Sequence, residues 1–240
     1  MDTLPGHFQL DRSRNATVQV FEHLRELIVT LAIKPGMVLS RTQLADYFKL
    51  SLTPVRDALS RLEEERLVEI YPQHLTRVGK IDLASARQAH FLRLSIELEI
   101  VAALAGTPDP VLAGQLGALV NRQRACLQSQ DLENFTRIDM EFHKTMYLAA
   151  QLPDLWTMMR SSSGNLDRLR RLHLPLNGKA QSILAEHGAI VDCIAQGDPA
   201  AGRDVVRAHL SGTLSVLDAL RQTYRDFVLP VDYAPESVSA

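Results

Sequence analysis

Several features that mark other classes of protein are scarce in this chain of 240 residues. The two cysteines, Cys126 and Cys193, stand alone and give neither a disulfide framework nor a CxxC metal site. Aromatic residues make up only 5%, and the periodic segments are rich in Leu, Ala, Arg and Glu, which favours helix over sheet. No apolar run is long enough to span a bilayer, and the first residues lack the apolar core of a signal peptide. We therefore expect a cytoplasmic protein with no membrane partner.

The chain also lacks a large excess of charge of either sign. The net charge is −2, so there is no overall basic signature, and any contact with nucleic acid has to come from a local patch. Helical spacing and the segments that interrupt it divide the chain. We expect a flexible arm at 1–16, a first domain at 17–78, a linker at 79–85, a second domain at 83–226 and a tail at 227–240.

The first domain contains two short predicted helices within residues 41–66, joined by about four residues, which is helix-turn-helix spacing. Ser40 followed by Gln43 is a capping box that starts the first of these helices near Arg41. Thr53 before Pro54 predicts the N-cap of the second. The segments "LVEIY" and "LTRVGK" predict two strands joined by a turn. A helix-turn-helix followed by a hairpin is a winged helix-turn-helix.

A recognition helix reads DNA with the side chains of its first turns, because these point into the major groove. An arginine there can bond a guanine edge or a phosphate. A solvated surface side chain is the alternative for each candidate. The candidates are Ser51, Leu52, Thr53 and Arg56 at the start of the second helix, Arg41 and Thr42 at the start of the first, and Gln73, His74 and Arg77 in the hairpin.

From Leu83 onward no strand pattern remains. The periodicity predicts six helices, at roughly 83–105, 109–129, 131–150, 152–172, 178–196 and 198–226. The second domain is therefore expected to be an all-α helical bundle. The fold class follows as mainly α, with an N-terminal winged helix-turn-helix, a small β-hairpin wing and a C-terminal bundle.

Four side chains of the second domain form a candidate metal site. Asp139 and His143 lie four residues apart in "DMEFH", which places them on one face of a helix. His187 and His209 lie on or beside the inward faces of two later helices. Bundles build metal sites from such side chains on facing helices, and three imidazoles with one carboxylate suit zinc, nickel, manganese, cobalt or iron rather than calcium or magnesium.

Spacing alone leaves other interpretations open. The four residues can be a plain polar core, a structural metal clip or the centre of a mononuclear metal-dependent hydrolase. Against an enzyme, no general base is apparent, because Glu141 points off the face of Asp139 and Glu186 adjoins His187 on the wrong side. The other four histidines, including His90 and His173, are expected to have ordinary structural roles.

The motifs together resemble those of the GntR family of bacterial transcription regulators, in particular the FadR subfamily with its FCD effector domain. The first domain carries "LSLTPVRDAL", and the second carries "FLRLSIELE", "DMEFH" and "AEHGAIVDCIAQGDPAAGRDVVRAHL". The resemblance covers about residues 17–225. The count of six helices resembles the VanR-type variant of the effector domain rather than the variant with seven.

The resemblance implies more than the spacing does. Members of the family use one Asp and three His for a divalent metal, at positions that match Asp139, His143, His187 and His209. They also place an arginine near the ligand carboxylate, and Arg93 matches it. Two departures put the operator sequence in doubt, because Leu52 stands where an arginine is usual and Arg41-Thr42 where "ER" is common.

We therefore expect a regulator rather than an enzyme, acting as a repressor. Its partners would be double-stranded operator DNA, a small organic acid and a second copy of the chain in a homodimer. Its cofactor would be a divalent transition metal, with zinc favoured over nickel, manganese, cobalt or iron.

Overall fold

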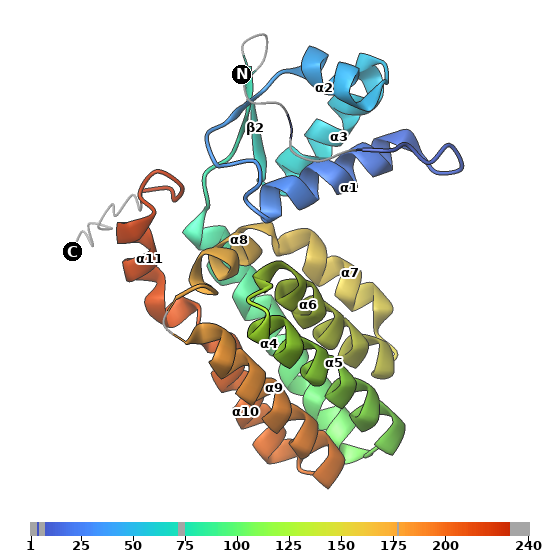
Figure 1. The fold of residues 1–240 in the computed structure, drawn as a ribbon, viewed down its shortest axis with the longest axis vertical. Helices are drawn as coiled ribbons and strands as arrows, with labels where there is room; N and C mark the ends of the chain where they lie inside the picture. Colours follow the sequence, from blue (N-terminus) through green and yellow to red (C-terminus); the bar gives the residue numbers. More distant parts are fainter. Residues whose placement is uncertain (1–3, 5–7, 72–74, 177, 231–240) are drawn as a thin grey trace, which may run out of the picture. The chain divides into compact units, whose positions relative to one another are not determined.

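The computed structural model describes residues 4, 8–71, 75–176 and 178–230 (Figure 1). The described residues divide into two compact units. The first unit holds the residues up to Ala84 and those from Arg221 onward, and the second holds Ser85–Leu220. The mainly α fold class is confirmed.

The first unit is a winged helix-turn-helix with a three-stranded antiparallel sheet in the order β1-β3-β2. The hairpin predicted from "LVEIY" and "LTRVGK" is present, and it pairs Val68 with Val78 and Tyr71 with Leu75. The pairing of β1 with β3 was not anticipated from the sequence. The elements are α1 (Ala16–Val29), β1 (Val38–Leu39), α2 (Arg41–Phe48), α3 (Leu52–Glu64), β2 (Val68–Tyr71) and β3 (Leu75–Val78).

Local sequence signals explain where these helices begin, with one correction. The side chain of Ser40 accepts a hydrogen bond from the backbone amide of Gln43, as the capping box predicts. The expected N-cap at Thr53 is wrong, since α3 already begins at Leu52 and Ser51 is its N-cap. Proline is tolerated within the first helical turn, where backbone amides have no intrahelical partner, so Pro54 does not have to be the first helical residue.

The second unit is a bundle whose long helices run alongside one another (Figure 1). Helix α5 packs against α6 and α9, and α9 packs against α10. Their contact surfaces form one apolar core that includes Leu116, Phe142 and Ile190, all fully or almost fully buried. The helices are α4 (Leu83–Gly106), α5 (Pro110–Gln128), α6 (Leu132–Ala149), α7 (Pro153–Ser162), α8 (Gly164–His173), α9 (Lys179–Gln196), α10 (Pro199–Ser211) and α11 (Leu217–Thr223), with a 3₁₀ turn at Leu214–Val216.

Two of the six helices predicted after Leu83 are interrupted, so the helix count behind the VanR-type comparison is wrong. The segment at 152–172 breaks at Ser163, whose hydroxyl lies 2.9 Å from the carbonyl oxygen of Arg160 and 2.7 Å from Oδ2 of Asp167. Serine side chains compete in this way with backbone hydrogen bonds. The segment at 198–226 breaks after Ser211, where Gly212 is a poor helix former. Among the described residues no helix is long and apolar enough to cross a membrane.

The end of the described chain returns to the first unit. The amide of Ile81 donates to the carbonyl of Phe227 at 2.8 Å, and the amide of Leu229 donates to the carbonyl of Ile81 at 3.0 Å. These bonds form an isolated parallel bridge between Ile81 and Val228. The segment between β3 and α4, predicted as a linker, is therefore paired with the residues that follow α11.

Candidate functional site

Helix α6 supplies two of the four candidate metal ligands. Asp131 caps the helix by accepting a hydrogen bond from the amide of Asn134 at 3.0 Å. The apolar residues Phe135, Ile138 and Phe142 turn one face of α6 inward. Asp139 and His143 lie on this same face, so the core that buries the apolar residues buries them too, with 2% and 1% of their surface exposed.

Helices α9 and α10 bring the other two ligands to the same point. His187 and His209 are 0% and 5% exposed. Nε2 of His209 lies 3.2 Å from Nε2 of His187 and 3.3 Å from Nε2 of His143. Oδ1 of Asp139 lies 3.7 Å from Nε2 of His187. The four predicted ligand atoms all lie within 4.8 Å of one another, so the structure brings together the whole set that the sequence predicted.

The opposite nitrogen of each imidazole faces an oxygen. Nδ1 of His187 lies 2.7 Å from Oε1 of Gln123. Nδ1 of His143 lies 2.8 Å from Oε2 of Glu97, and Nδ1 of His209 lies 2.8 Å from Oε2 of Glu186. Because an oxygen acceptor calls for a proton on Nδ1, these partners assign the proton of each neutral ring to that nitrogen and leave a lone pair on Nε2.

The protonation states suit a cation at the centre. Burial lowers the pKa of His143 to about 4, so the ring is neutral near pH 7. Burial also raises the pKa of Asp139, but the neighbouring charges, of which Arg170 is the strongest, together outweigh burial and hold that pKa well below its ordinary value. Burial likewise holds the pKa of His187 well below its ordinary value. The Nε2 atoms of three imidazoles converge here with the Oδ1 atom of Asp139, which has no hydrogen-bond partner among the described residues.

The spacing of these atoms also fits a metal. Two nitrogens bound to a tetrahedral zinc at about 2.0–2.1 Å lie roughly 3.3 Å apart. The two nitrogen pairs here are separated by 3.2 and 3.3 Å. Histidine ligands of a metal characteristically donate Nδ1–H to a carboxylate or carbonyl oxygen, and His187 and His209 have such oxygen partners, while Nδ1 of His143 lies in an ion-pair contact with Glu97. The buried cluster is therefore consistent with a metal site, and it offers no ligand softer than imidazole.

A pocket that is partly open to solvent adjoins the cluster. Its lining includes Asp139 and His209 from the cluster, together with Arg93 of α4. Arg93 is only 4% exposed, and its Nε donates to Oε1 of Glu97 at 2.7 Å. The arginine expected to meet a ligand carboxylate thus lines a pocket beside the candidate ligands.

Several residues at the site were missed by reasoning from the sequence. Glu97 and Gln123 were not considered at all. Glu186 was expected to lie on the wrong side, yet it contacts the rear of His209. His90 and His173, expected to be ordinary structural residues, both line the pocket. A polar residue at an inward helical position, such as Gln123 at 0% exposure, was the signal that could have found the partners of the histidines.

The candidate DNA-reading side chains at the start of α3 are exposed. Ser51, Leu52, Thr53 and Arg56 all face solvent, and 54% of Leu52 is exposed. Arg56 lies 3.6 Å from Asp57, with 66% of its side chain exposed, so this contact leaves the guanidinium open. On the opposite face of the helix Val55, Leu59 and Leu62 are buried.

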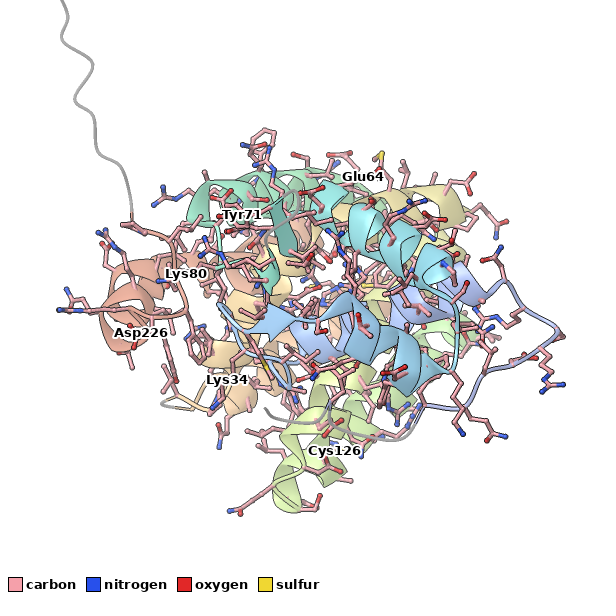
Figure 2. All side chains as sticks on the ribbon, turned by 90° about the horizontal axis from the view of Figure 1, so that it is seen from above. Lys34, Glu64, Tyr71, Lys80, Cys126 and Asp226 are labelled. Carbon is pink, nitrogen blue, oxygen red and sulfur yellow. The ribbon has the colours of Figure 1, made fainter. Side chains whose placement is uncertain are left out.

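The other candidate DNA-contacting side chains differ in exposure and in the contacts that hold them. Thr42 is exposed, and Nη2 of Arg41 lies 3.4 Å from Oγ1 of Thr76. Arg77 is held on the hairpin, where Nε donates to Glu69 at 2.7 Å and Nη2 lies 2.8 Å from the hydroxyl of Tyr71. Gln73 and His74 lie outside the described residues. In the view of Figure 2, Glu64 and Tyr71 mark the ends of α3 and β2.

Comparison with known proteins agrees with this arrangement. The sequence model of the FCD domain matches residues 88–212, which is more than half of the chain, and that of the bacterial regulatory proteins of the gntR family matches residues 16–78. The chain belongs to the GntR family and carries an FCD domain. A GntR regulator of this type, the FadR subfamily, binds DNA through the winged helix-turn-helix, here residues 16–78.

Named relatives and solved structures are similar over most of this GntR chain. An uncharacterized HTH-type transcriptional regulator in an unstable DNA locus of Streptomyces ambofaciens is 33% identical over 202 residues, covering 84% of this chain and 85% of the relative. The HTH-type transcriptional repressor RspR of Escherichia coli is 26% identical over 219 residues, covering 91% and 96%. The structure of E. coli McbR/YncC shares the fold, with a TM-score of 0.74, 21% identity, and coverage of 88% and 99%.

These relatives are transcription regulators, so the hydrolase alternative is set aside. Within the GntR regulator the pocket and the buried Asp/His cluster lie in the FCD domain, which is the effector-binding part of such proteins.

Proposed function

We propose that this regulator is a repressor that senses a small carboxylate through a metal in its FCD domain and binds operator DNA as a homodimer. The observation that carries the proposal is the convergence of three Nε2 lone pairs and one carboxylate oxygen beside a pocket that Arg93 lines. We propose repression because the relative RspR, whose alignment covers 91% of this chain, is named a transcriptional repressor.

The exposed start of α3 supports direct reading of operator DNA. The first turn of a recognition helix enters the major groove, where Arg56 can pair with a guanine edge or a phosphate. We propose the same DNA-facing role for Ser51, Leu52 and Thr53, and a role in holding the DNA backbone for Arg41 and Thr42. Arg77 would approach a neighbouring groove together with Gln73 and His74. One short helix buries little surface, and paired half-sites on a homodimer supply the affinity it lacks.

Asp139, His143, His187 and His209 would hold a divalent transition metal, with zinc favoured and nickel, manganese, cobalt or iron as alternatives. Such a metal, when bound, supplies a Lewis acid for a carboxylate oxygen. Arg93 would orient the same carboxylate, since one of its nitrogens is engaged by Glu97 and its fork still offers further N–H groups. The metal could instead only hold the bundle together, and in that case carboxylate binding does not depend on it.

Sensing requires that the ligand bind one arrangement of the protein more tightly than the other. We propose that carboxylate binding weakens the affinity for operator DNA by favouring the arrangement that binds DNA poorly. The reciprocal effect follows from linkage, so operator DNA lowers the affinity for the carboxylate by the same factor.

The test uses the full-length protein and the DNA upstream of its own gene. Specific, salt-dependent binding is expected, and it should be lost in Arg56→Ala and kept in Arg124→Ala, which removes an exposed charge from the FCD domain instead. Addition of a carboxylate that binds should release the DNA from the wild type and not from His187→Ala. Release that is equal in His187→Ala would show that the metal is only structural, and unchanged binding of Arg56→Ala would refute the role of α3.

A further inference from the structure

The pocket of the FCD domain has an unusual excess of basic side chains. Four of the described residues that line it are basic, namely Arg93, Arg170, Arg171 and Lys179, whereas Asp139 is its one acidic lining residue. Buried charges are costly unless they are paired, so the partners of these cations bear on what the pocket can bind.

Three of the four basic residues have an acidic partner. Nε of Arg93 donates to Glu97 at 2.7 Å. Nη2 of Arg170 donates to Oδ2 of Asp139 at 2.6 Å, and Nη1 of the same residue lies 3.9 Å from Asp167. Nζ of Lys179 lies 3.9 Å from Oε2 of Glu186, which is a weak contact.

Arg171 differs from the other three. It is half-buried at the pocket, and the structure gives its side chain no hydrogen bond or ion pair with any described residue. Asp167, the remaining nearby acid, also accepts a hydrogen bond from Arg160 at 2.7 Å. When Arg160 is counted with the four basic lining residues, five basic side chains share the four acidic ones, Glu97, Asp139, Asp167 and Glu186, before any metal is counted. A divalent metal in the Asp/His cluster adds two positive charges to this excess.

A second observation also indicates a ligand at this place. His90 lines the pocket at 9% exposure, and its Nε2 is buried with no hydrogen-bond partner among the described residues. A buried polar atom without a partner is uncommon in native proteins, and a bound group beside it is one explanation.

From this imbalance we infer that the effector carries at least two anionic groups, one for the metal and Arg93, and a second for Arg171 and Lys179. The inference rests on the proposed carboxylate sensing and adds to it the class of ligand. A ligand with a single carboxylate would neutralise one charge and leave Arg171 without a partner. A dicarboxylate and a phosphorylated acid both meet the requirement, because each combines a carboxylate with a second anionic group that Arg and Lys bind well.

The test is calorimetric titration of the full-length, zinc-loaded protein with two matched pairs of probes, with the zinc content measured after each titration. The first pair is butanoate and succinate, and the second is glycerate and 2-phosphoglycerate. At least one dianion is expected to bind about tenfold or more tightly than its matched monoanion, as a charge-assisted hydrogen bond allows. The pair that shows the preference distinguishes a second carboxylate from a phosphoryl group.

Two variants locate the second anionic group. In Arg171→Gln the affinity for the dianion is expected to fall nearly to that for the matched monoanion, while the affinity for the monoanion stays the same. Arg207→Gln is the matched control, because Arg207 is an exposed arginine of α10 that does not line the pocket. It removes the same charge from the same unit and should keep the preference.

The outcomes separate this inference from the function on which it rests. Monoanions that bind as tightly as dianions in both pairs, or an unchanged preference in Arg171→Gln, would overturn the inference and leave metal-assisted carboxylate sensing in place. If none of the four probes binds the zinc-loaded protein, both the inference and the carboxylate sensing are contradicted.

Discussion

Removing the partner of one histidine tests the metal centre without touching a ligand. Gln123 is fully buried on α5, and its Oε1 lies 2.7 Å from Nδ1 of His187. In Gln123→Leu the shape of the side chain is nearly kept, but the N–H of His187 loses its acceptor and the ring loses its orientation. An unpaired buried donor costs about 1–3 kcal/mol. Loss of such a partner weakens metal binding by about 10–100-fold, which corresponds to about 1.4–2.7 kcal/mol.

The two estimates agree, so we expect the zinc affinity of Gln123→Leu to fall by about 10–100-fold. Competition with a chelating dye of known affinity measures this directly. Gln115→Leu is the matched control, since Gln115 lies exposed on the same helix and should leave the affinity unchanged. Equal zinc affinities of wild type and Gln123→Leu, with both proteins folded, would refute the argument that the Nδ1 partners prepare the three histidines for a metal.

Two further predictions concern pH and DNA. In the folded, metal-free protein, burial lowers the pKa of His143 from 6.5 to about 4. Between these two pH values His143 is therefore protonated in the unfolded chain and neutral in the folded protein. The free energy of unfolding of the metal-free protein should therefore fall as the pH drops from about 6.5 to about 4, and His143 should account for roughly 3 kcal/mol of this fall. A free energy of urea unfolding that stays constant over this pH range would contradict the lowered pKa of His143. At the DNA interface, the exposed apolar Leu52 is expected to contact a thymine methyl group. The test uses an operator obtained by in-vitro selection, in which deoxyuridine replaces that thymine. The replacement should weaken DNA binding by the wild type and leave DNA binding by Leu52→Ala unchanged. An equal loss of DNA affinity in both proteins would exclude the contact.

The four candidate ligands could be predicted because each depends on the phase of a single helix. Asp139 and His143 are a turn apart on α6, and apolar neighbours turn that face inward. His187 and His209 are buried on α9 and α10 for the same reason. Periodicity reports the inward face of a helix, but it does not report which inward residues of different helices meet. Spacing therefore made convergence in one site possible, and the family resemblance made it the favoured interpretation.

The partners of the ligands show what periodicity leaves out. Glu97, Gln123 and Glu186 come from three different helices, and their contacts depend on how those helices are rotated and shifted against one another. The break at Ser163 was missed for a related reason, because the apolar spacing continues across it while a serine hydroxyl engages Arg160 and Asp167. The start of α3 was misplaced by one signal, Pro54, which several positions in the first turn of a helix tolerate.

Elemental analysis of the purified protein tests the central claim most directly. The account predicts close to one equivalent of a divalent transition metal per chain in the wild type, and a large loss of it in His187→Ala with the fold retained. A wild-type protein that holds no transition metal after purification without chelators, and takes up none on addition of zinc, would contradict it.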